Sequence, residues 1–424
     1  MYKEINCCRV CNSNNLEPIL SLGNLMVSDF FVSPKKARGI FAPLELVLCD
    51  ENNEGCGLLQ LKHTVSSEAM FRNYWYLSGI NQTMTDELTQ ISKSASEIAQ
   101  LKFDDFVIDI GSNDATLLRS YDVDGLNTIG FEPAKNLFDV GSKGVTKIIS
   151  DFFNFNSWKE LYGERKAKVI TAIGMFYDLD DPNTFVNDLY KCLDDEGLLV
   201  IQMMYVPFFL ERNAFDGICH EHLEYYTLKS LSYLLEMHGF EIVDAKVREE
   251  INEGSVRFFI RKSGKGRSLN VSDDAQENLS KLIELEKNLK LNELNTYYAL
   301  VDRILEAKHK TLSFLNAEVK NGKVIHGYAA STKGNTTLQF YEITTNLISA
   351  IAERNPIKFG LYTAGSNIPI ISENESRSLN PDYYFILAWH FLPEFIKREK
   401  KFFDEGGSFI VSMPEFKVIN ALNI

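Results

Sequence analysis

The hydrophobic positions of the first half of the chain form short apolar runs that alternate with helical stretches. Each run is brief enough for a strand, and several end in glycine or an acidic residue. They occur in FVIDIGSND, NTIGFEP, AKVITAIGMF and EGLLVIQMM, and FEIVDAKVREE and SVRFFIRKS follow as two closing strands. Alternating strands and helices predict a mostly parallel sheet with helices on both faces.

The second half begins with a different pattern. Residues 272–319 carry leucines and aromatics at helical spacing with lysines and glutamates between them, which predicts one long bridging helix, or two, with a solvated charged face. The strand and helix rhythm then resumes in KVIHGYAASTKGNTTLQF, LISAIAERN, YYFILAWHF and SFIVSMP. We therefore expect a second, smaller α/β domain.

Cysteines distinguish the N-terminal segment. Five of the seven lie in the first 56 residues: Cys8 and Cys11 form a C-x2-C pair, and Cys49 and Cys56 flank a short polar loop. Such clustering in a reducing compartment indicates metal binding. Four thiolates make a closed, structural zinc site, with Cys7 as the rival of Cys8. We predict three domains: a zinc module at 1–70, an α/β domain at 71–265 and a C-terminal α/β domain at 266–424.

Composition narrows the possible partners. The chain has 424 residues, 45% of them hydrophobic, and a net charge of −14, which disfavours nucleic acid because phosphates need a basic surface. The sequence has no run of about 18 apolar residues, so it predicts no membrane span. The N-terminus lacks the apolar stretch of a signal peptide, so we expect a cytoplasmic protein. An anionic substrate would need a local basic pocket.

The first strand ends in a glycine turn. Asp109 precedes Gly111 by two residues, while Asn113 and Thr116 occupy the positions where a dinucleotide fingerprint has further glycines. Glu132 ends the next strand, where a carboxylate can bind the ribose hydroxyls. The pattern favours a nucleoside without a pyrophosphate, such as S-adenosylmethionine, over NAD. A plain turn glycine and a strand-end acid remain the structural alternative.

The segment GICHEHLEYYTLKSL places His220, Glu221 and His222 in consecutive positions. A zinc helix of the HExxH type is disfavoured, because the residue four after His220 is Glu224. Two interpretations remain: a polar connection whose side chains bond to the backbone, and a proton-transfer site, since histidine titrates near neutrality.

The motifs in their order resemble the three-domain sugar C-methyltransferases. The resemblance extends almost end to end through CRVC, CGLLQL, YWYLSG, DIGSND, GFEP, HEHLEYYTLKSL, KGNT, RNPIKFGLYTAGSNIPI, PDYYFILAWHF and GGSFIVSMP. It implies a zinc module, a class I methyltransferase domain with a Rossmann-like sheet that binds S-adenosylmethionine, and a Rossmann-like domain that binds a nucleotide sugar.

The resemblance also implies a chemistry, which is methylation of the carbon beside a 4-keto group of a deoxysugar. That carbon reacts only after losing a proton, so the site needs a base and an enolate donor. His222 matches the family's base, Glu221 would orient it, and His220 or a tyrosine would support the enolate oxygen. Tyr76 matches a family tyrosine near the transfer centre.

Further residues are expected to bind the two ligands. On the cofactor side, Asp151 would accept from the adenine amino group, with a helix N-cap as its alternative, and Met175 would wall the cofactor. The acceptor is expected to be a small molecule linked to a nucleoside diphosphate. The residues expected to contact it are Lys333, Asn335, Arg354, Lys358, Tyr226 and His390.

The chain departs from the family pattern mainly on the acceptor side. Cys219 stands where many members have tyrosine, and Gln202 ends a strand where glutamate is common. Methylation of a sugar oxygen with the same histidine base, and a non-catalytic nucleotide-sugar scaffold, are the alternatives. Asn113 and Thr116 weaken an NAD-dependent dehydrogenase. We expect a monomer or a homodimer in deoxysugar biosynthesis.

Overall fold

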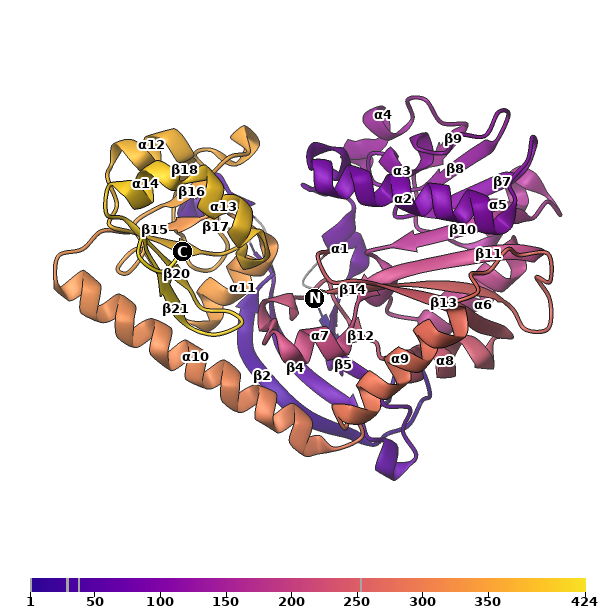
Figure 1. Cartoon of the computed structure of the whole chain (residues 1–424), viewed down its shortest axis with the longest axis horizontal. Coiled ribbons are helices and arrows are strands. Elements are labelled where there is room, and N and C mark those ends of the chain that lie inside the picture. Colours follow the sequence, from indigo (N-terminus) through magenta and orange to yellow (C-terminus); the bar gives the residue numbers. More distant parts are fainter. Residues whose placement is uncertain (1, 28–29, 37–38, 252–253) are drawn as a thin grey trace.

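Two α/β parts lie on opposite sides of the molecule, with a small antiparallel sheet below and between them (Figure 1). The computed structural model describes residues 2–27, 30–36, 39–251 and 254–424. This arrangement confirms the expected fold class: two α/β sheets preceded by a cysteine-rich module.

The first α/β part contains a seven-stranded sheet of order β13-β14-β11-β10-β7-β8-β9. The strands β9, β8, β7, β10 and β11 run parallel, and β14 pairs antiparallel with both β11 and β13. Their bounds are β7 Phe106–Ile110, β8 Asn127–Phe131, β9 Lys147–Ile149, β10 Ala167–Ile173, β11 Leu193–Met204, β13 Phe240–Arg248 and β14 Ser255–Lys262. Pattern alone missed β9, because three residues are too few to show a period.

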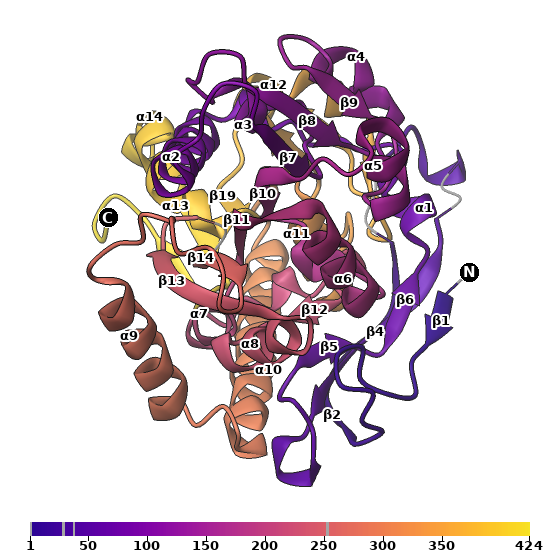
Figure 2. The ribbon, with the colours of Figure 1, turned by 90° about the vertical axis from the view of Figure 1, so that its right-hand side faces the viewer.

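Both faces of this sheet are covered. Consecutive residues of one strand enter different cores: Val107 packs with α2 (Gln82–Ala99), whereas Ile108 packs on the opposite side. Figure 2 shows α2 and α3 on one side of the sheet and α5 and α6 on the other. The helices of this part are α3 Thr116–Arg119, α4 Phe138–Gly141, α5 Phe155–Tyr162, α6 Pro182–Cys192, α7 Val206–Glu211 and α8 Leu228–Met237. Burial on both faces explains why the strands read as continuous apolar runs.

The second α/β part has a six-stranded sheet of order β18-β16-β15-β19-β20-β21, parallel except for β21. Its strands are β15 Ile325–Tyr328, β16 Ile351–Glu353, β18 Ile370–Ser372, β19 Tyr383–Ile386, β20 Ser408–Val411 and β21 Lys417–Ile419. Its helices are α11 Thr332–Phe340, α12 Glu373–Ser378, α13 Leu392–Arg398 and α14 Lys400–Asp404.

The bridging segment consists of two helices, α9 (Ala275–Asn288) and α10 (Leu294–Lys320). They are separated near Lys290, whose φ of 54° lies in the left-handed region and cannot continue a right-handed helix. In Figure 1, α10 runs along the lower edge of the second α/β part. On its buried side, Leu300 and Ile304 belong to the core of that part.

The N-terminal module shares its interior with both α/β parts. Its sheet has the order β12-β5-β4-β2, with bounds β2 Leu16–Met26, β4 Phe41–Cys49, β5 Leu59–Leu61 and β12 Glu224–Tyr225. Leucines of β2, β4 and β5 join the core of the second α/β part, whereas Cys8, Cys49 and Cys56 pack with the first. The remaining elements of the module are β1 Tyr2–Glu4, β3 Phe30–Phe31, β6 His63–Val65 and α1 Ser67–Phe71, and β3 pairs with β17 Tyr362–Thr363. The module therefore joins the two larger parts.

A buried histidine predicts acid sensitivity of the second α/β part. Burial lowers the pKa of His326 in β15 to about 4, and its Nδ1 lies 2.7 Å from Ser376 Oγ. The folded pKa is below the unfolded value of about 6.5, so this stabilisation is complete above pH 6.5 and is lost as the pH falls toward 4. We expect wild type to lose about 2 kcal/mol more than His326→Asn between pH 7 and pH 5, measured by urea unfolding. Equal losses would contradict this assignment.

Candidate active site

The turn that carries His220, Glu221 and His222 lies where the three parts of the molecule meet. It follows η6 (Phe215–Gly217) and leads into β12, which pairs with β5 of the N-terminal sheet. Leu223 bonds in both directions: its carbonyl accepts from Leu61 N at 2.9 Å, and its N–H donates to Tyr177 O at 2.9 Å. The backbone of the turn is thereby fixed to both neighbouring parts.

His222 is half-buried with a defined orientation. Its Nδ1 lies 2.8 Å from Gly217 O, so Nδ1 carries the proton and the lone pair of the neutral ring is on Nε2. The ring of Tyr177 meets the imidazole edge-on at 4.6 Å. Donor atoms of Cys219, Glu221 and His222 all lie within 4.8 Å of one another.

His220 points the other way. It is 4% exposed, and its Nε2 lies 2.9 Å from Ala42 O in β4. Burial lowers its pKa, so the ring is neutral at physiological pH. This contact attaches the turn to the N-terminal sheet. Tyr226 is also internal: its hydroxyl donates to Glu224 Oε2 at 2.9 Å, and it is 1% exposed.

The glycine turn lies at the point where the strand order of the first sheet reverses. β8 lies on one side of β7 and β10 on the other, and ligands of such sheets bind beyond the carboxyl ends of the central strands. Gly111 has a φ of 68°, and a Cβ there would lie 3.2 Å from Met175 Cγ. Gly111 and Met175 therefore lie against each other at this edge. A glycine here leaves the backbone of the turn open to a ligand.

Two buried carboxyls, Glu132 and Asp109, lie beside this turn. Glu132 accepts from Asn113 N at 2.7 Å and from Ala134 N at 2.7 Å, and only 6% of it is exposed. Asp109 accepts from Thr171 Oγ1 at 2.6 Å, and burial raises its pKa to about 7. Both carboxyls are thus at the predicted edge, and Glu132 holds the backbone of the turn.

The segment that contains Tyr76 is bonded to the same turn. Asn113 Oδ1 accepts from Ser78 N at 3.0 Å, Asn113 Nδ2 donates to Tyr76 O at 3.1 Å, and Asp114 accepts from Gly79 N at 2.8 Å. Tyr76 keeps 46% of its surface exposed, yet surrounding protein raises its pKa to about 12. Tyr76 is therefore a neutral, partly exposed phenol beside the turn.

Asp151 lies after β9 and is half-exposed. It accepts from Arg72 Nη2 at 2.9 Å, and the Arg72 guanidinium stacks over the Phe152 ring at 4.7 Å. Arg72 follows α1 and connects this edge of the sheet to the N-terminal module. The contacts of Asp151 are thus formed with a cation and with its own loop.

The second sheet has its own reversal point between β15 and β19. Lys333 and Asn335 lie in the first turns of α11, directly after β15, and His390 follows β19. Lys358 Nζ donates to Ala330 O at 2.7 Å in the loop before α11. Arg354 lies on the surface, with 75% of its side chain exposed. Lys333, Arg354 and Lys358 therefore lie around this reversal point and form its basic edge, in which Glu353 lies 4.0 Å from Lys358 and Glu394 lies 3.9 Å from Arg354.

This basic edge faces the turn that carries His222. Trp389 Nε1 donates to Asp216 Oδ2 at 3.1 Å, across the boundary between the two α/β parts. The charge of Lys333 acts on the thiol of Cys219. The structure thus brings Lys333, Glu221 and His222 into one region, and Trp389, the neighbour of His390, bonds to Asp216 in the preceding segment.

The four predicted zinc ligands converge at the N-terminal module. Cys8 Sγ lies 3.6 Å from Cys56 Sγ, Cys11 Sγ lies 3.4 Å from Cys49 Sγ, and the four sulfurs are mutually within 4.8 Å. Sulfurs of a tetrahedral zinc site are about 3.8 Å apart, given Zn–S bonds of about 2.3 Å. Gln60 Nε2 donates to Cys8 Sγ at 3.1 Å. The donor set fits a closed structural zinc site.

Three family models match the chain in series. They are "Putative zinc binding domain" at residues 8–71, "Methyltransferase domain" at 76–245 and "C-methyltransferase C-terminal domain" at 250–414. The chain belongs to the three-domain C-methyltransferases. It is an S-adenosylmethionine-dependent methyltransferase with a zinc-binding module, so the expected family and both expected cofactors are confirmed.

One relative spans the whole methyltransferase. C-methyltransferase NovU of Streptomyces niveus is 27% identical over 424 residues, covering 99% of this chain and 98% of its own length. Solved structures cover less. A methyltransferase of Clostridium acetobutylicum covers 42% of this chain and 92% of its own, at 12% identity and a TM-score of 0.33. A Burkholderia thailandensis toxoflavin methyltransferase covers 43% and 81%, at 18% identity and a TM-score of 0.31.

Two residues near the turn were not singled out from the sequence. The charge of Glu221, together with burial, raises the pKa of Tyr74 well above its usual value, so Tyr74 is a neutral phenol close to that carboxylate. Burial and the charges of Glu221 and Glu224 raise the pKa of Asp178. Tyr74 stands two residues before Tyr76 in one motif, so the motif pointed to the region but not to this phenol.

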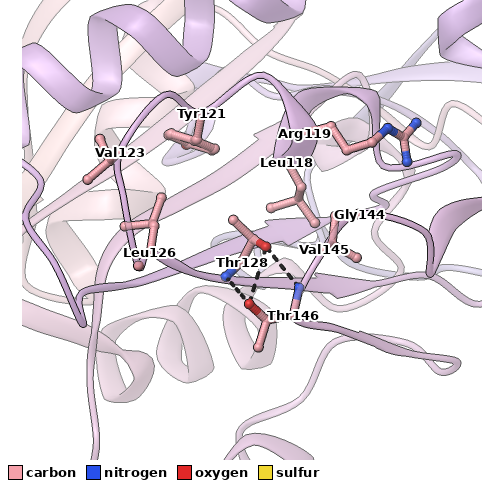
Figure 3. Close-up of a pocket in the computed structure, with 10 residues that line it drawn as sticks. Leu118, Arg119, Tyr121, Val123, Leu126, Thr128, Gly144, Val145 and Thr146 are labelled. Carbon is pink, nitrogen blue, oxygen red and sulfur yellow. Dashed lines mark hydrogen bonds between the residues drawn. The ribbon is translucent and has the colours of Figure 1, made fainter.

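A separate hollow of about 330 Å³ lies elsewhere on the methyltransferase domain (Figure 3). Its lining comes from α3, the start of β8 and the loop before β9, and it contains no predicted site residue. There Thr128 and Thr146 exchange hydrogen bonds, each N–H donating to the other's Oγ1 at 3.0 Å.

Within the described part of the chain, none of the helices has the length and apolar character that a membrane span requires.

The zinc site yields a test with a matched control. Cys49→Ser removes one of four sulfurs, whereas Cys7→Ser removes a neighbouring thiol outside the cluster. We expect Cys7→Ser to keep about one zinc per chain after dialysis against a weak chelator and Cys49→Ser to lose it and unfold at a lower temperature. Zinc content by mass spectrometry and thermal unfolding measure both effects. If Cys7→Ser lost its zinc and Cys49→Ser kept it, the assignment of the four zinc ligands would be wrong.

Glu132 provides the test of the cofactor turn. In Glu132→Gln, the amide NH₂ would face Asn113 N–H or Ala134 N–H and leave that buried donor unpaired. Because such a loss costs about 1–3 kcal/mol, we expect S-adenosylmethionine to bind about 10–100-fold more weakly by calorimetry. The exposed Glu160→Gln in α5 serves as the control and should bind normally. If both variants bound S-adenosylmethionine normally, Glu132 would have no role in cofactor binding.

Proposed function

We propose that this enzyme methylates a carbon beside the 4-keto group of a deoxysugar carried on a nucleoside diphosphate, with His222 as the base. The observation that carries the proposal is the junction itself. The turn of His222 lies between the reversal points of two parallel sheets, one with the cofactor turn and one with a basic edge. The similar NovU is named a C-methyltransferase, which supports the same chemistry.

The contacts of His222 suit proton abstraction. Because Nδ1 donates to Gly217 O, the lone pair is held on Nε2, where it can take a proton from an acidic carbon. Glu221 has a donor atom within 4.8 Å of the imidazole and would stabilise the imidazolium that forms. S-adenosylmethionine, when bound, supplies the electrophilic methyl group to the resulting carbanion.

The enolate oxygen needs a hydrogen-bond donor. Tyr74 is held neutral beside Glu221, and Tyr76 is neutral beside the cofactor turn, so both phenols keep their protons at physiological pH. One preorganised donor of this kind is worth about 3 kcal/mol. We assign the donor role to these phenols. His220 has its Nε2 against Ala42 O, which supports a structural role for it.

The nucleoside diphosphate would bind at the basic edge of the second sheet. Lys333 lies at the start of α11, where the helix N-terminus adds N–H donors and a favourable dipole. Lys358 adds a cation at the neighbouring loop through its contact with Ala330 O. In a chain with a net charge of −14, these lysines are the cations that would attract an anionic acceptor.

The decisive test is exchange of the acceptor's α-proton. His222→Asn keeps a side-chain donor for Gly217 O but has no atom at the Nε2 position. We expect it to slow both methylation and solvent deuterium exchange by about 10²–10⁴-fold, with S-adenosylmethionine affinity unchanged. Wild type and the exposed-site control His309→Asn should exchange at equal rates. Mass spectrometry of nucleotide 4-keto sugars incubated in deuterated water measures the exchange.

The same experiment separates carbon from oxygen methylation. Exchange at the α-carbon that depends on His222 supports carbanion chemistry. Methyl transfer without any exchange, with the methyl found on a sugar oxygen, would instead support methylation of a hydroxyl. Full exchange in His222→Asn would show that another group is the base.

A further inference from the structure

We propose that Cys219, Glu221 and His222 form a second metal site, suited to a zinc-class divalent cation. One donor atom from each lies within 4.8 Å of the others. Among the residues described, the four-cysteine cluster is the one other group with this property. The two sites differ in kind, because four thiolates close a coordination sphere, whereas three protein ligands leave one position open.

The donor types suit zinc and its close relatives. A thiolate, an imidazole and a carboxylate are all established ligands of Zn²⁺ and Co²⁺. The hydrogen bond from His222 Nδ1 to Gly217 O is the outer contact that commonly orients a metal-bound histidine, and it places the coordinating lone pair on Nε2. On binding, Cys219 would release its proton to solvent.

The surroundings also favour a cation. Asp178 Oδ1 is buried and has no hydrogen-bond partner within the described ranges, and the charges of Asp178 and Glu221 both act on Cys219. Lys333 opposes them with one positive charge. A divalent ion would be attracted by the half-buried Glu221, and Asp178 would lie near it as a further oxygen donor or as an outer partner.

The sequence pattern hid this site because its spacing is not helical. HExxH places two histidines on one helix face, whereas Cys219, Glu221 and His222 lie in a tight turn between η6 and β12. The turn is constrained by the bonds of Leu223 to Leu61 and Tyr177. Residues one, two and three positions apart can therefore converge without helical geometry.

Occupancy of this site has a consequence that rests on the proposed function. A cation on His222 Nε2 and a proton on the same nitrogen exclude each other. Excess Zn²⁺ would therefore inhibit reversibly by removing the base, and a chelator too weak to strip the four-cysteine site would restore activity.

Cobalt provides a readout that does not require activity. We would titrate the enzyme, with its four-cysteine zinc in place, with Co²⁺ and record the thiolate-to-cobalt absorption band. We expect one Cys219-dependent equivalent in wild type and in the control Cys192→Ala. In Cys219→Ser we expect the band to disappear and the affinity to fall at least about tenfold. Cobalt that replaces the structural zinc would give a band that survives in Cys219→Ser.

The outcomes separate the two proposals. A band that is absent in wild type, or unchanged in Cys219→Ser, overturns the metal site. His222→Asn reports on the same site and should weaken cobalt binding to a similar degree, so a fold defect in one variant is not decisive. If cobalt binds through Cys219 but proton exchange is not inhibited, the metal site stands and the role of His222 as the base falls.

Discussion

The organisation of this enzyme depends on the backbone bonds of one residue. Leu223 accepts from β5 of the zinc module and donates to the turn after β10 of the methyltransferase sheet. Each bond is ordinary in strength, worth about 1 kcal/mol. Their effect is positional: they hold the turn of His222 against two other parts of the chain. Trp389 adds a third attachment through Asp216.

The zinc module acts as a structural link between the two α/β parts. Its cysteines pack with the core of the methyltransferase sheet, and its leucines pack with the core of the C-terminal part. Burial in the two cores and ligation by the four cysteines together hold the module in this position. The zinc-binding module is thereby linked through β5 and Leu223 to the turn of His222.

The electrostatic design around His222 is acidic at its centre and basic at one edge. Glu221, Glu224 and Asp178 act on one another and on the nearby phenols, and burial keeps those phenols neutral and able to donate. Lys333 and Lys358 stand on the side of the second sheet. Under the proposed function, proton transfer would take place at the acidic centre and diphosphate binding at the basic edge. The same acidic centre is one basis of the proposed cation site.

Much of the fold followed from the sequence, because its signals are local. The strand runs, the glycine turn after β7, the cysteine spacing and the segment around His222 are all read within a few residues, and the structure has them at those positions. Bridging residues 272–319 showed a helical period, but their division near Lys290 depends on a single left-handed residue that carries no strong signal.

What tertiary structure decided was the set of partners. Glu132 accepts from Asn113 N and Ala134 N, and Tyr226 donates to Glu224 inside the core, contacts that the sequence pattern did not specify. His220 and His222 are two residues apart, yet one contacts β4 and the other Gly217. By itself, the sequence determined the elements, the domain series and the kinds of chemistry available. Only the fold decided which side chains meet, because a contact such as that of His220 with Ala42 joins residues 178 positions apart, and local patterns do not encode which distant segments come together.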